Sequence, residues 1–152
     1  MNKELKENII AFLGLNKSKL GVVGTINDQG KPESAALYYT FDGDLNIYFA
    51  TKDSTRKYKN ILKNENVSFV VVTEEPPQTL QLEGVASVHS DAGDQRHLFE
   101  ELVGLASFRH FSAPINQQPA GGLQFVKITP TWLRFGNFEV RKHGDTFEEV
   151  KL

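Results

Sequence analysis

The sequence predicts a single, mainly β domain: an antiparallel β-barrel, closed or nearly closed, with helices packed against it. Many short apolar runs rich in β-branched residues are separated by turn sequences, and short turns join the first three runs, as in an antiparallel meander. Only two or three segments have a helical period. The 152 residues suit one domain spanning 1–152, and no linker suggests a second.

The first half of the chain should contain a helix, three strands and a second helix. Apolar residues at near-helical spacing predict an amphipathic helix that ends at Gly14; they are Leu5, Ile9, Ile10, Phe12 and Leu13. Strands are expected over 20–26, 33–41 and 45–51, joined by the turn sequences NDQGKP and DGD. A short helix follows over 56–64, where Tyr58, Ile61 and Leu62 recur at helical spacing.

The second half should return to strands around one more helix. The run VSFVVVT (67–73) is apolar at consecutive positions, so we expect a strand buried on both faces. A long strand over 79–90 contains Gly84, which predicts a bulge or bend. Residues 91–105 predict a helix with Asp94 as N-cap and with Leu98, Phe99, Leu102 and Val103 on its inner face. The last strands are expected over 123–129, 131–140 and 146–152.

The segment 106–122 has no period and is rich in Pro, Gly and Asn. A loop of that length inside a compact domain is usually functional or mobile. Its Phe108 and Phe111 suggest either a docked apolar anchor or a substrate lid, and its His110 either a solvated side chain or a general acid or haem ligand. The sequence leaves these alternatives open.

The composition excludes several classes of protein. A formal net charge of -2 argues against non-specific nucleic-acid binding, which relies on a basic surplus. The absence of cysteine excludes disulfides, thiolate metal sites and thiol nucleophiles, and the four histidines lack metal-site spacing. No apolar run approaches the roughly 20 residues of a membrane span, and the N-terminus does not read as a signal peptide. We therefore expect a cytoplasmic protein.

Cations and hydroxyls gather where the third strand ends, in FATKDSTRKYKN (49–60). Arg56 and Lys57 open the following helix, where backbone N–H groups have no intrahelical partner and the helix dipole favours an anion. Arg grips phosphate through paired hydrogen bonds, Lys adds a point charge, and Thr51, Ser54 and Thr55 add hydroxyls. The pattern predicts a phosphomonoester site. The alternative is that Thr55 or Ser54 caps the helix and the cations are solvated.

The order of elements around this cluster resembles that of a known family. The run LGVVGTINDQGKPESAALYYTFDGDLNIYFATKDSTRKYKNILKNENVSFVVV, with its T-x(3)-T-R-K step and the Asn of the following helix, is similar to the pyridoxamine 5′-phosphate oxidase-like family of flavin-binding split barrels. The resemblance covers roughly residues 8–90, and more loosely LQFVKITPTWLRFGN near the end. It implies an antiparallel split β-barrel that binds FMN at a homodimer interface.

The resemblance also implies a role for individual residues. Thr51 corresponds to a threonine that hydrogen-bonds the flavin side, and Thr55, Arg56 and Lys57 to the set that holds the phosphate. The backbone of Ala35, Ala36 and Leu37 corresponds to the stretch that faces the isoalloxazine ring. Thr79 falls where many relatives place a glutamine from the dimer mate. Trp132 is a candidate for lining the flavin pocket, with core packing as the alternative, and Lys52, Asp53 and Ser54 are turn residues.

Two departures separate the chain from true pyridoxamine phosphate oxidases. Those enzymes have arginine at the position of Ala35, and they end in an Arg-x-His segment; here Arg141 and His143 have that spacing without the surrounding strand pattern. The chain looks more like the shorter relatives related to general stress proteins. The resemblance implies an FMN-dependent oxidoreductase of unknown substrate, with NAD(P)H as a candidate electron donor. Alternatives are a non-catalytic flavin carrier or sensor, a haem-binding relative, or a binder of the deazaflavin F420.

Overall fold

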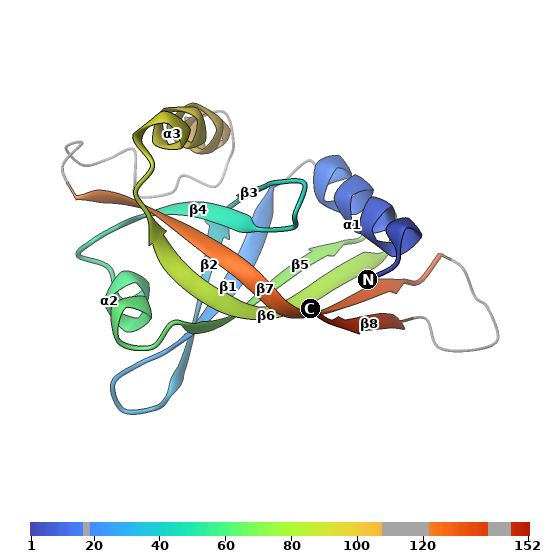
Figure 1. Ribbon diagram of the computed structural model, residues 1–152, viewed down its shortest axis with the longest axis horizontal. Coiled ribbons are helices and arrows are strands. Elements are labelled where there is room, and N and C mark those ends of the chain that lie inside the picture. Colours follow the sequence, from blue (N-terminus) through green and yellow to red (C-terminus); the bar gives the residue numbers. More distant parts are fainter. Residues whose placement is uncertain (17–18, 108–121, 140–146) are drawn as a thin grey trace.

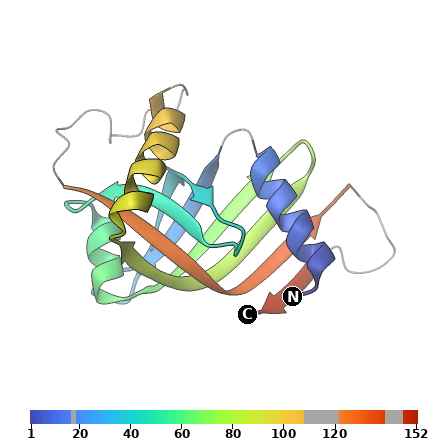
Figure 2. The same ribbon diagram turned by 45° about the horizontal axis from the view of Figure 1, so that its top comes forward.

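The computed structural model describes residues 1–16, 19–107, 122–139 and 147–152. Its strands form one antiparallel sheet in the order β2-β1-β5-β6-β7-β4-β3, and β8 also pairs with β7. The sheet curls until β2 contacts β4, which gives the barrel-like shape in Figures 1 and 2. The strands are β1 (Leu20–Ile26), β2 (Pro32–Tyr38), β3 (Thr40–Phe41), β4 (Ile47–Lys52), β5 (Asn66–Thr73), β6 (Gln78–His89), β7 (Leu123–Asn137) and β8 (Phe147–Lys151). This architecture confirms the predicted split barrel.

Helix α1 (Lys3–Leu15) packs on the main core. The side chain of Asn2 caps its start by accepting a hydrogen bond from the Leu5 N–H at 2.7 Å. Its apolar face is buried as the sequence predicts, and the Phe12 ring lies 5.6 Å from that of Phe135. The helix ends at Leu15, with Asn16 as its C-cap donating its N–H to the Phe12 carbonyl, so the predicted stop at Gly14 is wrong.

Helix α3 (Ala92–Ser107) covers a second, smaller core. The carboxylate of Asp91 caps its start by accepting hydrogen bonds from the N–H groups of Gly93 and Asp94 at 2.9 and 3.1 Å. Asp94, the predicted cap, therefore lies in the first turn. Leu98 is buried as expected, as is Leu102, but Phe99 is 45% exposed, because it points away from this core. The Val103 side chain lies outside the described residues.

Two predicted strands differ from the structure. The segment 33–41 is broken at Tyr39, which is fully buried, with its ring edge-on to Phe69 at 5.4 Å. Strand β5 alternates between buried Val67, Phe69 and Val71 and exposed positions, with Val72 68% exposed. The expectation that this strand is buried on both faces is therefore wrong: α1 and the core cover one face, and the other has no covering layer among the described residues.

Strands β6 and β7 form the long spine of the sheet. The sequence predicts separate strands over 123–129 and 131–140, but β7 is continuous through Pro130 and ends at Asn137. The pairing register shifts between Glu83 and Gly84, so the irregularity predicted at Gly84 is confirmed. A Cβ at Gly84 would lie 2.5 Å from the Thr129 carbonyl oxygen, because the two backbones approach closely there.

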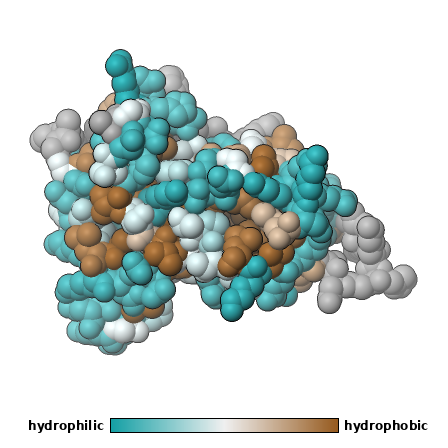
Figure 3. Space-filling view, viewed as in Figure 1, coloured by the Kyte–Doolittle hydropathy of each residue, from teal (hydrophilic) through white to brown (hydrophobic). Residues whose placement is uncertain are grey.

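The surface in Figure 3 carries a band of apolar residues across its middle, bordered by hydrophilic ones. No helix in the described part of the chain combines the length and apolarity that crossing a bilayer demands.

Candidate functional site

The cation and hydroxyl cluster lies where β4 leaves the sheet and α2 (Arg56–Lys63) begins. A tight turn makes the connection: the Thr55 N–H donates to the Lys52 carbonyl at 3.1 Å. The Asp53 N–H donates to the Gly122 carbonyl at 2.8 Å, which fixes the turn against the start of β7. Gly122 has a positive φ of 81°, and a Cβ there would lie 2.8 Å from a carboxylate oxygen of Asp53. Hydrogen bonds within the turn and to Gly122 thus fix the segment between β4 and α2.

The hydroxyls of Thr51 and Thr55 form one hydrogen-bonded chain. Thr55 Oγ1 donates to the Lys52 carbonyl at 2.8 Å and lies 2.9 Å from Thr51 Oγ1. Because the single Thr55 proton is already committed, Thr51 must be the donor between the two. Thr55 also accepts from the Tyr58 N–H at 3.4 Å, so it caps α2, as one of the two sequence interpretations predicted.

Capping by Thr55 leaves the N–H groups of Arg56 and Lys57 at the open end of the helix, where an anion is favoured. The Lys57 side chain is half-buried, and burial lowers the pKa of its ammonium group. In the described part of the chain no carboxylate pairs with it. A partly dehydrated cation without a counter-ion, beside free helix N–H groups, is electrostatically suited to an anionic ligand.

Arg56 is arranged differently, because its guanidinium pairs with the Glu33 carboxylate of β2. Its side chain is 81% exposed, whereas that of Glu33 is 20% exposed. The amides of Asn27 and Asn60 each donate to Glu33 at 3.0 Å, and Asn60 also donates to Thr25 Oγ1 at 3.1 Å. Hydrogen bonds from Asn27 and Asn60, followed by Arg56, hold the pKa of Glu33 below its usual value.

Sequence reasoning missed this Glu33 network. Arg56 and Asn60 are four residues apart, so the sequence alone predicts that they share a face of α2. Nothing local in the sequence shows that this face lies against the β1–β2 hairpin, because that packing depends on the sheet.

The predicted β2 stretch lies close to the cluster, two residues beyond Glu33. Ala35 is partly buried against the core, Ala36 is exposed and Leu37 is 5% exposed. Strand β2 is at an edge of the sheet, so one row of its backbone N–H and C=O groups has no strand partner among the described residues. Its backbone is therefore open to a ligand that presents matching hydrogen-bonding groups.

Thr79 lies far along the sheet from the cluster within one chain. Thr51 pairs with Gln124 of β7, whereas Thr79 pairs with Gly136 of the same strand. A strand rises about 3.3 Å per residue, so the stretch of β7 between these partners measures about 40 Å. Thr79 Oγ1 donates to the Val71 carbonyl at 3.3 Å. A single chain therefore does not bring all the predicted site residues together.

Trp132 lines an open groove of about 360 Å³ on the outer face of the sheet. Its indole N–H donates to Glu149 at 2.8 Å, and its side chain is partly exposed, so it does not belong to the buried core. Val22, Ser34, Ser68, Val70 and Gln81 share the groove, so it crosses the sheet from β7 to β2.

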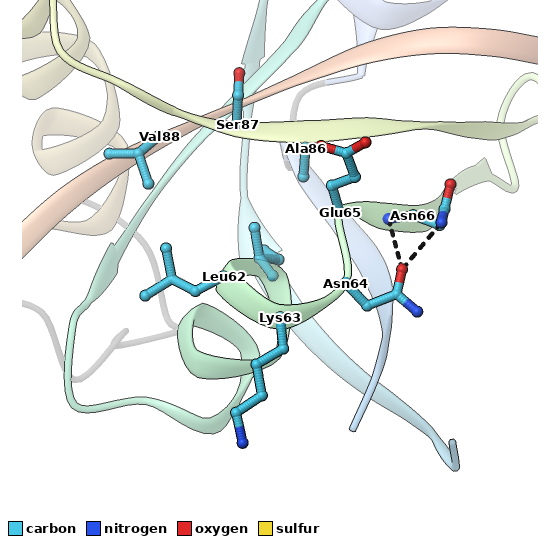
Figure 4. Close-up of a pocket in the computed structure, with 9 residues that line it drawn as sticks. Leu62, Lys63, Asn64, Glu65, Asn66, Ala86, Ser87 and Val88 are labelled. Atoms are coloured by element: carbon cyan, nitrogen blue, oxygen red, sulfur yellow. Dashed lines mark hydrogen bonds between the residues drawn. The ribbon is translucent and has the colours of Figure 1, made fainter. Parts of the chain in front are cut away.

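A second hollow, of about 480 Å³, lies at the C-terminal end of α2, away from Arg56 and Lys57 at its start (Figure 4). Asn64 Oδ1 accepts from the backbone and side-chain N–H groups of Asn66 at 3.1 and 3.0 Å on one side of it. Leu62 and Val88 lie on the other side and are 62% and 37% exposed. Neither this hollow nor the groove beside Trp132 is lined by Thr51, Thr55, Arg56 or Lys57. Phe108, His110, Phe111, Arg141 and His143 lie outside the described residues.

Comparison with known proteins relates the chain to one family. Residues 5–137 match the family described as Pyridoxamine 5′-phosphate oxidase. A protein related to general stress protein 26 from Clostridium acetobutylicum is 18% identical, with a TM-score of 0.72 over 100% of this chain and 97% of that one. General Stress Protein 26 from Bacillus anthracis is 21% identical, with a TM-score of 0.70 over 98% and 99%. No curated protein matches significantly in sequence.

Two other solved structures are named for different ligands. A pyridoxamine 5′-phosphate oxidase-related, FMN binding protein from Nostoc punctiforme is 10% identical, with a TM-score of 0.67 over 96% of this chain and 95% of that one. A heme binding protein from Mycobacterium smegmatis is 14% identical, with a TM-score of 0.64 over 88% of this chain but 52% of the other. At identities this low, the likeness shows a shared fold and does not show a shared ligand.

Proposed function

Since the chain belongs to the pyridoxamine 5′-phosphate oxidase family, we propose that it binds FMN by the 5′-phosphate at the N-terminus of α2 and acts as a flavin-dependent oxidoreductase. The observation that carries the proposal is Lys57: a half-buried cation without a carboxylate partner in the described part of the chain, beside the open N–H groups of the helix. A phosphomonoester supplies the dianion that this arrangement lacks.

Each residue of the cluster has a distinct role in this proposal. Lys57 supplies charge, and the N–H groups of Arg56 and Lys57 point along the helix axis toward the phosphate. Thr55 and the buried Thr51 keep the helix start in place through the hydrogen bond between their hydroxyls. The open backbone edge at 35–37 would hydrogen-bond the polar rim of the ring system. Bound flavin supplies hydride or electron transfer, so the protein needs to position and shield it rather than provide its own acid or base.

The proposed site is completed by a second copy of the chain. Thr79 lies about 40 Å along β7 from the partner of Thr51, so we infer that it joins the site from another subunit. The groove with Val22, Val70 and Trp132 leaves apolar surface uncovered on the outer face of the sheet, where a homodimer would bury it. We therefore propose a homodimer with flavin at the interface.

A comparison of FMN with riboflavin tests the phosphate site directly, because the two ligands differ only in the phosphate. Titration of the purified chain, followed by flavin fluorescence, should give a dissociation constant for FMN at least tenfold lower than for riboflavin. Equal constants would contradict a phosphate site at α2. The molar mass from light scattering, with and without FMN, tests the homodimer, and a monomer in both states would refute it.

The absorbance spectrum and turnover assays separate the remaining alternatives. Flavin bands support the proposal, whereas a Soret band on addition of haem, without uptake of FMN, would favour a haem-binding protein such as the one from Mycobacterium smegmatis. Competition between F420 and bound FMN tests the deazaflavin alternative. Oxidation of NADH or NADPH by the FMN-loaded protein distinguishes an oxidoreductase from a flavin carrier.

A further inference from the structure

Glu33 introduces a negative charge beside the proposed phosphate site. Its carboxylate holds the Arg56 guanidinium, and the Asn27 and Asn60 amides hold the carboxylate itself. Asn60 is 7% exposed and is fixed in turn by its bond to Thr25, so the carboxylate is fixed by groups of the hairpin and of α2. The exposed partner in the pair is Arg56, whose side chain is 81% exposed and has no other partner in the described part of the chain to hold it.

The net positive charge at the start of α2 is therefore smaller than the presence of Arg56 and Lys57 suggests. Arg56 and Lys57 carry two positive charges, and Glu33 cancels one of them. A phosphomonoester carries about 1.5 to 2 negative charges at neutral pH. It would meet a site with one net positive charge, and it would compete with a carboxylate for the same guanidinium. Carboxylate and phosphate bind guanidinium through the same paired geometry, so the competition is direct.

We propose that Glu33 is an affinity-setting residue: it neutralises Arg56 in the empty site, so that a phosphomonoester must draw the guanidinium away from it to bind tightly. Lys57 then provides the first contact with the phosphate and Arg56 the second. The competition weakens FMN binding and makes the flavin exchangeable between protein and solution. The identity of the ligand as FMN rests on the proposed function, but the competition concerns the phosphate alone.

Structural attachment of α2 does not require the Glu33–Arg56 pair. Asn60 already links the helix to Thr25 of β1, and Lys63 pairs with Asp28 of the same hairpin at 3.6 Å. Glu33→Gln should therefore free Arg56 without detaching the helix. It keeps one accepting oxygen, and its NH2 group costs one of the two bonds from Asn27 and Asn60. The Asn60–Thr25 and Lys63–Asp28 links remain. Asp28 offers a matched control, since it is an acid on the same hairpin, pairs with a lysine of α2 and does not contact Arg56.

The experiment compares the wild type, Glu33→Gln and Asp28→Asn in titrations with FMN, riboflavin and inorganic phosphate, after thermal unfolding has shown that each variant is folded. Glu33→Gln should bind FMN about tenfold more tightly than the wild type, with riboflavin changed less than twofold, whereas Asp28→Asn should leave FMN affinity within twofold. In an Arg56→Ala background the gain from Glu33→Gln should shrink to twofold or less. If Glu33→Gln does not fold, Glu33→Ala serves for the same comparison.

The outcomes separate this inference from the proposed function. FMN binding that is unchanged or weakened in Glu33→Gln, or a gain that persists at full size without Arg56, overturns the competition while leaving the flavin site intact. A wild type that takes up no FMN, but whose phosphate affinity rises in Glu33→Gln, overturns the flavin proposal and supports the competition. Absence of FMN and phosphate binding in both proteins overturns both.

Discussion

Replacement of Lys57 by methionine should weaken FMN binding without weakening the fold. Methionine keeps an unbranched apolar stem only one atom shorter than lysine and removes the charge. Lys57 is half-buried, burial lowers the pKa of its ammonium group, and no carboxylate in the described part of the chain offsets that cost. Its charge therefore does not stabilise the empty protein, which agrees with the role in ligand binding proposed for it.

The size of the effect follows from the type of contact. A hydrogen bond to a charged group contributes about 1.5–3 kcal/mol. Since about 1.4 kcal/mol corresponds to a factor of ten, the dissociation constant for FMN should rise by roughly 12- to 150-fold. The free energy of unfolding of the flavin-free protein should stay equal or rise by a few tenths of a kcal/mol, on the order of 1 °C in melting temperature for a domain of this size.

Fluorescence titration with FMN and riboflavin, together with thermal unfolding, measures both quantities. Lys59→Met is the matched control, because Lys59 lies on the same helix and is exposed. It should change neither FMN affinity nor stability appreciably. The reasoning is refuted if Lys57→Met binds FMN as the wild type does, or if it loses as much affinity for riboflavin as for FMN.

Three further changes test the structure around the site. The stability contributed by Glu33 should be fully present above pH 4.5, its ordinary pKa, and be lost as the pH falls through its lowered folded value; urea unfolding from pH 6 to 3 should show a shallower decline for Glu33→Gln. Thr55→Ala should cost about 1 kcal/mol by removing the cap of α2, as measured by urea unfolding at pH 7, and no loss would contradict the capping geometry. Gly84→Ala should cost about 1–3 kcal/mol because its Cβ would press on the Thr129 carbonyl; Gly43→Ala, with nothing within 4 Å, should be nearly neutral in the same assay.

The sequence predicted those elements whose signals are local. Strand β1 spans 20–26 as expected, because a β-branched run is bounded by a clear turn, and α2 begins at Arg56, because Thr55 supplies a cap there. The fold class and the family are confirmed. The roles assigned to the nine site residues stay predictions, although the structure places Thr51, Thr55, Arg56 and Lys57 together at one strand exit.

What the sequence could not predict depends on distant packing. Residues 69–72 are apolar at four consecutive positions, yet Val72 is exposed, since such a run does not reveal whether a layer covers its second face. Asp91 and Asp94 are both good caps, and only the path of the chain out of β6 selects Asp91. The Glu33–Arg56 pair joins residues on separate elements, so it exists only once the hairpin lies against α2.

The dependence of β4 on β7 affects the order in which the protein becomes functional. Among the described residues, β4 is hydrogen-bonded to β3 and β7, and β3 is a strand of two residues. The partner of Thr51 is Gln124, so the strand that ends in the cation cluster has little to pair with until that later segment exists. A chain synthesised from its N-terminus carries the whole cluster early but cannot hold it in place until β7 emerges. If the chain loads the proposed cofactor, we expect it to do so only after β7 has been made.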